Sequence, residues 1–224
     1  MDDRVARTNL FVRAKDVYMK QQKRKTIHHF NDPGHAHFLT FSCYQQLPLL
    51  SRERTRRWFI QATVDARKRY NFALLAYVIM PEHAHFIVFP LFAIYDIALF
   101  LKAIKQSVAR KAKHFLRDHN RDWLEKLTVQ RGRRKVFRFW QTGPGYDRNI
   151  HSENELLEKI MYIHNNPVKR GLVSIPEEWK WSSASWYSGE RNVELAIDDF
   201  VFSSSVRSYL CQKDTDKQVC PCHP

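Results

Sequence analysis

Long apolar runs are absent from this chain: no stretch approaches the ~20 consecutive apolar residues that a membrane-spanning helix needs. The first residues, Met1 to Arg4, also lack the basic and then apolar pattern of a secretion signal. We therefore expect a soluble, cytoplasmic protein with no membrane partner. With 224 residues, of which 44% are hydrophobic, the chain is long enough to bury one good core.

Cysteine is scarce, with four residues at Cys43, Cys211, Cys220 and Cys222. The last two belong to the sequence Cys-Pro-Cys-His at residues 220–223, whose side chains are of metal-ligating types. This segment lacks the second, upstream pair of a zinc module, so we expect a disordered tail rather than a metal site. Cys43 is expected to be a small buried residue of a strand.

Acidic residues are too few to balance the basic ones. Asp and Glu number 23 against 37 Lys and Arg, which gives a formal net charge of +14. Such an excess attracts phosphate backbones and indicates a nucleic-acid partner. The positive charge is clustered in runs, at residues 23–25, 52–57, 67–69, 102–113 and 131–138. Most runs of this kind are merely solvated faces of helices.

The run at residues 131–138 differs from the others because it leads directly into Phe139 and Trp140. Basic side chains bind phosphates, and aromatic rings can stack on unpaired bases. We therefore expect this segment to contact DNA. The residues predicted to bind DNA, including those of the first run, are Lys23, Arg24, Lys25, Arg131, Arg133, Arg134, Lys135 and Arg138.

Two histidines one residue apart lie in the apolar, strand-like segment 80–88. Side chains alternate along a strand, so His83 and His85 would share one face and could meet one cation, while the apolar residues between and after them face a core. The same order of residues recurs at His35 and His37. Most histidines in apolar surroundings are structural, so spacing alone leaves open which pair, if either, binds a metal.

A helix is predicted over residues 152–166. Ser152 followed by Glu155 is typical of a capping box at its start, and Pro167 would end it. Tyr162 and Asn166 are four residues apart, so a phenol and a carboxamide would project from the same side of this helix. The alternative interpretation of Tyr162 is an amphipathic core residue that anchors the helix.

Three segments together resemble a known family, the single-tyrosine HUH transposases, and within it the REP-associated tyrosine transposases of bacteria. The segments are Val-Ile-Met-Pro-Glu-His-Ala-His-Phe at 78–86, Tyr-Ile-His-Asn-Asn-Pro-Val-Lys-Arg-Gly-Leu-Val at 162–173, and Trp-Lys-Trp-Ser-Ser at 179–183. The resemblance implies a transposase domain over residues 31–190. A basic N-terminal extension at 1–30 and a C-terminal extension at 191–224 would flank it.

The resemblance also implies roles for individual residues. His83 and His85 would bind a divalent ion, with Asn166 as the third ligand, and Tyr162 would be the nucleophile. Glu82 stands where many members have Asn, which leaves the ligand geometry intact. Two imidazole nitrogens and one amide oxygen suit either Mg²⁺ or Mn²⁺, the ions that the family uses, and they leave zinc open as well.

The expected fold class is α+β. Strands are expected at residues 35–43, 72–79, 82–89 and in a turn-rich segment within 136–149, and helices at 51–70 and 94–116. The order β-α-β-β-α-β is that of a ferredoxin-like antiparallel sheet, to which the catalytic helix would be appended. By the resemblance, His35 and His37 open the first strand. The aromatic segment 179–187 is expected to be a packing clasp that closes the core.

The sequence thus predicts a metal-dependent transposase that cleaves and rejoins single-stranded DNA at hairpin, REP-like sequences through a 5′-phosphotyrosine at Tyr162. One alternative is a domesticated protein that binds such hairpins without cleaving them. Another is a phosphodiesterase that uses water as its nucleophile. We expect association with the nucleoid. A homodimer, in which the tyrosine of one subunit serves the site of the other, is left open.

Overall fold

The computed structural model describes residues 31–143 and 145–198. The first half contains β1 (Ala36–Ser42), the 3₁₀ helix η1 (Tyr44–Gln46), α2 (Glu53–Tyr70), β2 (Phe72–Ile79), β3 (His83–Pro90) and α3 (Ile97–His119). The second half contains α4 (Arg121–Lys126), β4 (Thr128–Arg131), β5 (Arg134–Phe137), β6 (Tyr146–Ile150), α5 (Glu153–His164), α6 (Asn166–Lys169), the 3₁₀ helix η2 (Pro176–Glu178) and α7 (Ala184–Tyr187).

Four strands form the main sheet, in the order β2-β3-β1-β6, and each pairs with its neighbours in the antiparallel direction. The first α-helix of the series, α2, connects β1 to β2, and α3 leads from β3 towards β6. This arrangement is the ferredoxin-like β-α-β-β-α-β sheet, so the predicted fold class is confirmed. β2 is the most buried strand because all eight of its residues are buried, which matches its continuous apolar sequence.

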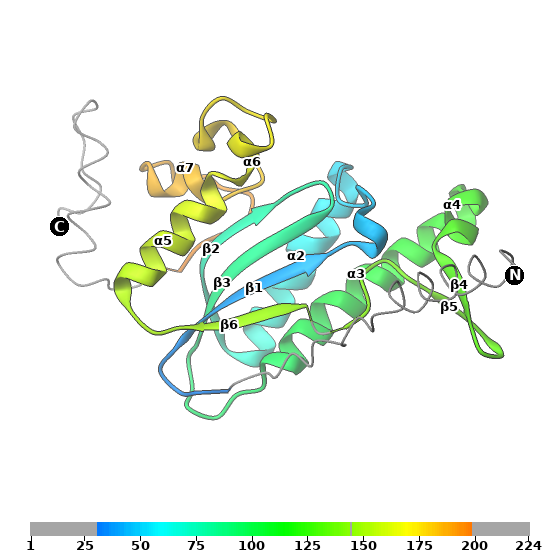
Figure 1. Cartoon of the computed structure of the whole chain (residues 1–224), viewed down its shortest axis with the longest axis horizontal. Coiled ribbons are helices and arrows are strands. Elements are labelled where there is room, and N and C mark those ends of the chain that lie inside the picture. The colour runs from blue at the N-terminus through cyan, green and yellow to red at the C-terminus, as the bar shows by residue number, and fades with distance from the viewer. Residues whose placement is uncertain (1–30, 144, 199–224) are drawn as a thin grey trace, which may run out of the picture.

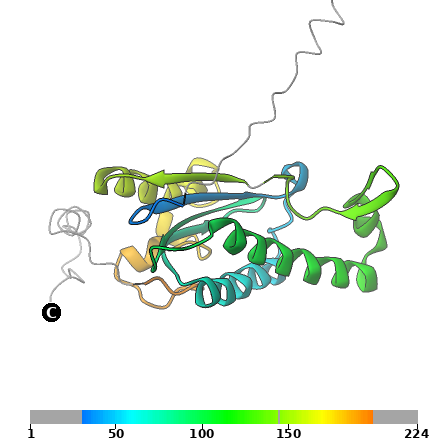
Figure 2. The same ribbon diagram turned by 90° about the horizontal axis from the view of Figure 1, so that it is seen from below.

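Helices cover both faces of this sheet (Figures 1 and 2). On one face, α2 and α3 lie side by side, and apolar residues of both helices join Leu39, Phe41 and Phe86 of the sheet in one core. On the other face, α5 packs its predicted apolar stripe against Phe38 and Ile87 in a second core. The alternation of side chains along β1 and β3 therefore divides the interior into two layers.

The helix predicted over residues 152–166 is divided in two. Ser152 caps α5 as expected, since its Oγ accepts a hydrogen bond from the backbone N–H of Glu155 at 3.1 Å. α5 ends at His164, and Asn166 begins the separate short helix α6, with Pro167 in its first turn. Proline is tolerated in the first turn of a helix, where the backbone N–H groups have no partner within the helix. It disfavours helical geometry in the residue before it.

The expectation of one turn-rich strand within residues 136–149 is wrong in part. A two-stranded hairpin of β4 and β5 precedes β6, and a two-residue turn joins its strands, with Gly132 at a φ of 59°. The short α4 before the hairpin was not predicted. In both views of the molecule, the hairpin projects from the end of α3, away from the main sheet (Figures 1 and 2).

The aromatic segment after η2 packs on the core through Trp181, as predicted, and it also covers the outer edge of β2. The backbone N–H of Ile79 donates to the carbonyl of Trp181 at 2.8 Å, and that of Ser183 donates to the carbonyl of Tyr77 at 3.0 Å. Trp181 is itself buried. The clasp therefore satisfies backbone groups that an edge strand would expose.

Several expectations concern the ends of the chain. Leu195 is buried and its backbone N–H donates to the Tyr77 hydroxyl at 3.2 Å, so the residues just after 190 pack on the core. The predicted extensions 1–30 and 191–224 remain predictions, because they lie wholly or mainly outside the described residues. Cys43 is fully buried, as expected. The remaining cysteines lie outside the described residues.

Among the residues that the structure describes, no helix combines the length and the apolarity that crossing a membrane requires.

Candidate active site

The two histidines of β3 lie on the face of the sheet that α5 covers. His83 is opposite Ser42 and His85 is opposite Thr40 in the pairing of β3 with β1. Their ring centroids are 4.7 Å apart. Ala84 and the other alternating residues of β3 face the opposite core, under α2 and α3. The predicted alternation along this strand is therefore confirmed, and it brings two imidazoles together on one face.

His85 has one engaged and one free ring nitrogen. Its Nδ1 lies 2.9 Å from Thr40 Oγ1, while its Nε2 is buried and has no hydrogen-bond partner among the residues described. With the proton on Nδ1, that nitrogen donates to the threonine hydroxyl and Nε2 presents its lone pair. A buried nitrogen without a partner is costly unless a ligand completes it. The donor atom thus fits a metal ion.

His83 is oriented by a carboxylate. Its Nδ1 lies 3.2 Å from Glu82 Oε1, and the same oxygen accepts a hydrogen bond from Arg170 Nη1 at 2.7 Å. A carboxylate on one ring nitrogen is the usual way in which proteins orient the other nitrogen towards a metal. Arg170 follows α6, so this ion pair also ties the segment after α5 to β3.

Both imidazoles are held in the neutral form. Burial, with a smaller contribution from the neighbouring His83, lowers the pKa of His85 to about 3. Burial also lowers the pKa of His83, although Glu82 opposes the shift. Neutral imidazole is the form that binds metal ions, so the pair does not have to lose protons at neutral pH before it can act as ligands.

The burial of His85 predicts that the protein loses stability in mild acid. The unfolded chain takes up a proton at this residue below pH 6.5, whereas the folded chain resists it down to about pH 3. Above pH 6.5, His85 is neutral in both the folded and the unfolded chain, and its burial costs no stability through protonation. As the pH falls below 6.5, the free energy of unfolding decreases by up to ~1.4 kcal/mol for each pH unit. Urea unfolding at pH 7.5, 6.5 and 5.5, without metal, should show this slope. The variant His85→Gln should show a smaller slope, and equal slopes would contradict the prediction.

Tyr162 lies beside the histidine pair. Its ring centroid is 5.5 Å from that of His85 and 6.0 Å from that of Phe38. Its side of α5 is accessible, since the residue is 43% exposed. Lys169 Nζ lies 5.4 Å from the same ring centroid. A single chain therefore brings the phenol and the imidazoles together, although they are separated by about eighty residues in the sequence.

Asn166 is less directly connected to the pair. The hydrogen bond that the structure records for its side chain runs from Nδ2 to the carbonyl of Tyr162, at 3.0 Å. This bond leaves Oδ1 as the atom suited to a metal ion. Within residues 31–143 and 145–198, no three His, Cys, Asp or Glu side chains form a cluster that could hold a metal. Another oxygen donor is thus needed to complete a site at the histidine pair.

The earlier histidine pair lies elsewhere and is hydrogen-bonded to other parts of the chain. His37 Nδ1 is 2.9 Å from Asp147 Oδ1, and its Nε2 is 2.8 Å from the Tyr95 hydroxyl. His35 Nδ1 lies 3.3 Å from the carbonyl of Ile150. The structural interpretation therefore suits His35 and His37, which lie at the start of the first strand.

The predicted DNA-binding residues lie mainly on the β4–β5 hairpin, where Arg131, Arg133, Arg134 and Lys135 are exposed and Arg138 is half-buried. Lys23, Arg24 and Lys25 lie outside the described residues. Phe139 and Trp140 are buried, so the expectation that they stack on bases is wrong. The chain returns to the core after the hairpin, where the carbonyl of Phe139 accepts a hydrogen bond from Tyr44 and the indole of Trp140 donates to the carbonyl of Lys105.

Sequence reasoning missed the residues that orient the histidines. Thr40 had no visible signal, because its contact with His85 depends on the register between β1 and β3. Glu82 was noted only as a departure from the family pattern, yet its carboxylate contacts both His83 and Arg170. The position of Glu82 directly before the histidine pair was the one signal that could have revealed this role.

Comparisons with known proteins bear on the fold. No protein-family model and no curated protein matches the chain. A solved REP-associated tyrosine transposase, determined in complex with a REP hairpin, superimposes with a TM-score of 0.58 and 19% identity, over 80% of this chain and 96% of that one. A Deinococcus radiodurans R1 protein named provisionally as a transposase gives a TM-score of 0.37 and 16% identity, over 65% of this chain and 96% of that one. This chain therefore has the fold of a REP-associated tyrosine transposase, as its motifs predicted.

Proposed function

We propose that the protein is a metal-dependent transposase that cleaves and rejoins single-stranded DNA through a 5′-phosphotyrosine intermediate at Tyr162. One observation carries the proposal: an exposed phenol lies 5.5 Å, between ring centroids, from a buried imidazole whose Nε2 has no partner in the described part of the chain. Such a reaction needs a nucleophile and a Lewis-acidic metal ion beside the phosphate, and a free imidazole nitrogen is a ligand atom for such an ion.

The residues that would hold a metal ion are His83 and His85, through their Nε2 atoms, and Asn166 through Oδ1. When bound, a divalent ion polarises the scissile phosphate and stabilises negative charge on its oxygens. The set of two nitrogens and one oxygen accepts Mg²⁺ or Mn²⁺ and leaves positions for substrate oxygens. Thr40 and Glu82 would keep the two rings in place.

The phenol oxygen of Tyr162 would attack the phosphorus of the scissile phosphodiester. The oxygen–phosphorus bond to tyrosine forms as the bond to the 3′ oxygen breaks, the phenolic proton is lost, and the departing 3′ oxygen takes up a proton. Phenol has a reference pKa of ~10 and needs assistance. The ammonium group of Lys169, 5.4 Å from the ring centroid, would add positive charge beside the negatively charged phosphate. The phosphotyrosine bond then retains the energy for rejoining.

Hairpin DNA is the substrate that the chemistry and the comparison favour. The net charge of +14 and the exposed basic residues of the β4–β5 hairpin suit a phosphate backbone. The similar transposase was solved with a REP hairpin. The same charge would also serve a hairpin-binding protein that has lost cleavage, so cleavage itself is the property to test.

The test is incubation of the full chain with end-labelled single-stranded hairpin DNA and Mn²⁺, followed by a denaturing gel. A covalent protein–DNA adduct is the expected result. Tight binding without cleavage would instead support the domesticated hairpin-binding protein. Cleavage without any adduct would support the phosphodiesterase that uses water, and in either case the proposed function would be abandoned.

Loss of the Thr40 hydroxyl should weaken metal binding. Thr40→Val removes the partner of His85 Nδ1, so the ring loses its fixed orientation. Partners of this kind typically contribute about 10- to 100-fold in metal affinity. Titration of the protein with Mn²⁺, followed by calorimetry, measures the change. Thr63→Val is a matched control, because Thr63 is also buried but donates to the carbonyl of Phe59 in α2. Equal affinities in the two variants would contradict the metal assignment.

A further inference from the structure

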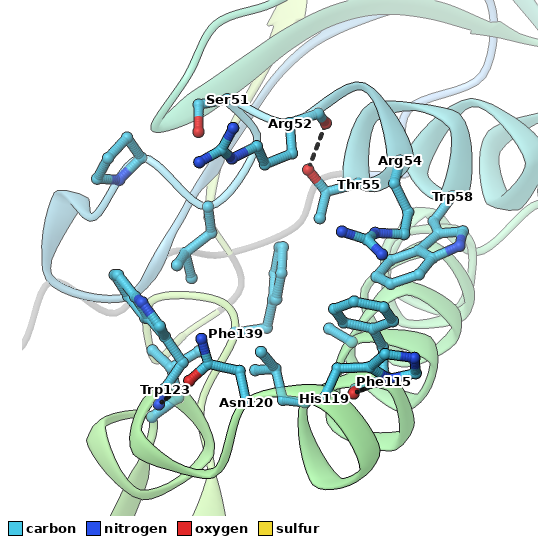
Figure 3. A pocket seen from close by; sticks show the side chains of 15 residues that line it. Ser51, Arg52, Arg54, Thr55, Trp58, Phe115, His119, Asn120, Trp123 and Phe139 are labelled. Carbon is cyan, nitrogen blue, oxygen red and sulfur yellow. Dashed lines mark hydrogen bonds between the residues drawn. The ribbon is translucent and has the colours of Figure 1, made fainter.

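A pocket lies on the other side of the sheet from the histidine pair, between the start of α2, the end of α3, and α4 (Figure 3). Its volume is about 570 Å³. Pockets of roughly 300–1,000 Å³ are typical of sites for small molecules or for a few chemical groups of a larger ligand. The proposed cleavage reaction does not use this pocket. The side chains that line it therefore have to indicate which ligand it binds.

Aromatic rings face each other across the pocket. Figure 3 shows Trp123 on one side, Trp58 and Phe115 on the other, and Phe139 between them. Phe115 already stacks between two groups: Arg54 Cζ lies 3.5 Å from its ring centroid, and the ring of His119 lies 4.2 Å away at an angle of 9°. Trp58 has its ring centroid 6.0 Å from that of Phe115, and Lys126 Nζ lies 4.5 Å from the ring centroid of Trp123. Both tryptophans are half-buried, so each keeps an exposed part of its ring for stacking on a ligand.

The charge around the pocket is positive. None of the fifteen residues that line it is acidic, whereas Arg52 and Arg54 lie at its rim. Arg57, one turn further along α2, pairs with Glu53. By contrast, Arg52 and Arg54 have no carboxylate partner in the part of the chain that the structure describes. Two such guanidinium groups beside stacking rings suit a ligand that combines anionic groups with flat rings.

The pocket is continuous with the basic hairpin. Leu127 and Phe139, which line it, flank β4 and β5 in the sequence, and the backbone N–H of Arg138 donates to the carbonyl of Leu127 at 2.6 Å. The exposed residues Arg131 to Lys135 therefore extend from the rim of the pocket. This surface provides phosphate-binding groups over a greater length than a single nucleotide would need.

The pocket also adjoins the end of the sheet that carries the histidine pair. Leu49 lines the pocket, and the backbone N–H of the next residue, Leu50, donates to the carbonyl of Pro81 at 2.8 Å. The N–H of Cys43 donates to the carbonyl of Glu82 at the same distance. The segment that contributes Leu49 to the pocket is thus hydrogen-bonded to the residues directly before His83.

From this arrangement we infer that the pocket binds unpaired bases of single-stranded DNA, which stack on Trp58 and Trp123 while their phosphates pair with Arg52, Arg54 and the β4–β5 hairpin. The inference rests on the proposed function in one respect, that the ligand is DNA. It adds a site on the opposite side of the sheet from the one that cleaves. Stacking of this kind is tolerant of sequence because every base has a flat face.

The test measures binding, without metal, of two fluorescein-labelled DNAs by fluorescence polarisation: the unstructured strand dT12 and a blunt hairpin of equal charge. Trp58→Ala and Trp123→Ala should each weaken binding of dT12 by about tenfold, the scale of one base–aromatic stack, and change binding of the blunt hairpin much less. Trp123→Phe should retain most of the affinity for dT12. Thermal unfolding of each variant reports whether the fold is kept.

Trp186→Ala is the matched control, because Trp186 is also half-buried and is covered by Arg191, 4.3 Å from its ring centroid, but lies on α7. It should bind both DNAs as the unaltered protein does. Unchanged binding of dT12 by both pocket variants would overturn the inference, and so would an equal loss for the two DNAs. If the unaltered protein binds neither DNA, the inference fails together with the proposed substrate, whereas a missing covalent adduct alone counts only against the cleavage reaction.

Discussion

Replacement of Tyr162 with Phe is expected to abolish the covalent protein–DNA adduct completely. The variant keeps the ring that packs near His85 and Phe38 but removes the oxygen that would bond to phosphorus. Because the side chain is 43% exposed and only its hydroxyl is lost, the free energy of unfolding should change by no more than ~0.5 kcal/mol. A denaturing gel with labelled hairpin DNA and Mn²⁺ measures the adduct.

Tyr146→Phe is the matched control for this loss. Tyr146 is similarly exposed, at 46%, and its ring also contacts Phe38, with 5.9 Å between centroids. This variant should form the adduct normally. Because the structure brings Tyr162 to the histidine pair of its own chain, a mixture of Tyr162→Phe with His85→Ala should not restore the adduct. Restoration would show that the tyrosine serves a partner subunit, and an adduct in Tyr162→Phe alone would exclude it as the nucleophile.

Substitutions in the two histidine pairs are expected to affect different properties. A change at His85 should lower activity, and a change at His37 should lower stability. His85→Ala removes the unpartnered Nε2, so metal-dependent cleavage should fall by about 10³-fold, which corresponds to ~4 kcal/mol of transition-state stabilisation. His37→Ala instead removes a fully buried ring that contacts both Asp147 and the Tyr95 hydroxyl. Its free energy of unfolding should fall by about 2–4 kcal/mol, since two buried hydrogen bonds are lost, one of them to a carboxylate.

Cleavage assays and thermal unfolding on both variants measure this separation. His37→Ala, assayed at a temperature at which it remains folded, should cleave nearly as fast as the unaltered protein. Its melting temperature should drop by roughly 10 °C, given the few degrees per kcal/mol expected for a chain of this size. A His37 variant that folds normally but no longer cleaves would mean that the earlier pair, rather than His83 and His85, contributes to the reaction.

Local periodicity explains why much of the fold could be predicted. The strict alternation around His83 and His85 identified both the strand and the face that carries the imidazoles. Helical spacing identified the buried stripe of α5, whereas Pro167 indicated the end of that helix only approximately, because α5 ends at His164 and Pro167 lies in α6. Each of these signals depends on residues close in the sequence, whose geometry is set by one element alone.

Contacts between elements could not be predicted in the same way. Thr40 reaches His85 only because β1 and β3 pair in one particular register, and no pattern within either strand specifies it. Phe139 and Trp140 follow a basic run, which indicated exposure, but the hairpin turns the chain back into the core at that point. The pocket between α2, α3 and α4 likewise combines segments far apart in the sequence.

The buried His164 gives α5 a fixed rotation about its axis. Its Nε2 lies 2.8 Å from Ser183 Oγ, in the clasp that closes the edge of β2. Residues two apart on a helix point in nearly opposite directions, so anchoring His164 against Ser183 turns Tyr162 to the other side of the helix, where its ring lies 5.5 Å from that of His85. Folding therefore fixes the direction of the Tyr162 side chain before DNA binds. Less entropy then has to be lost when the phenol is oriented towards a phosphate.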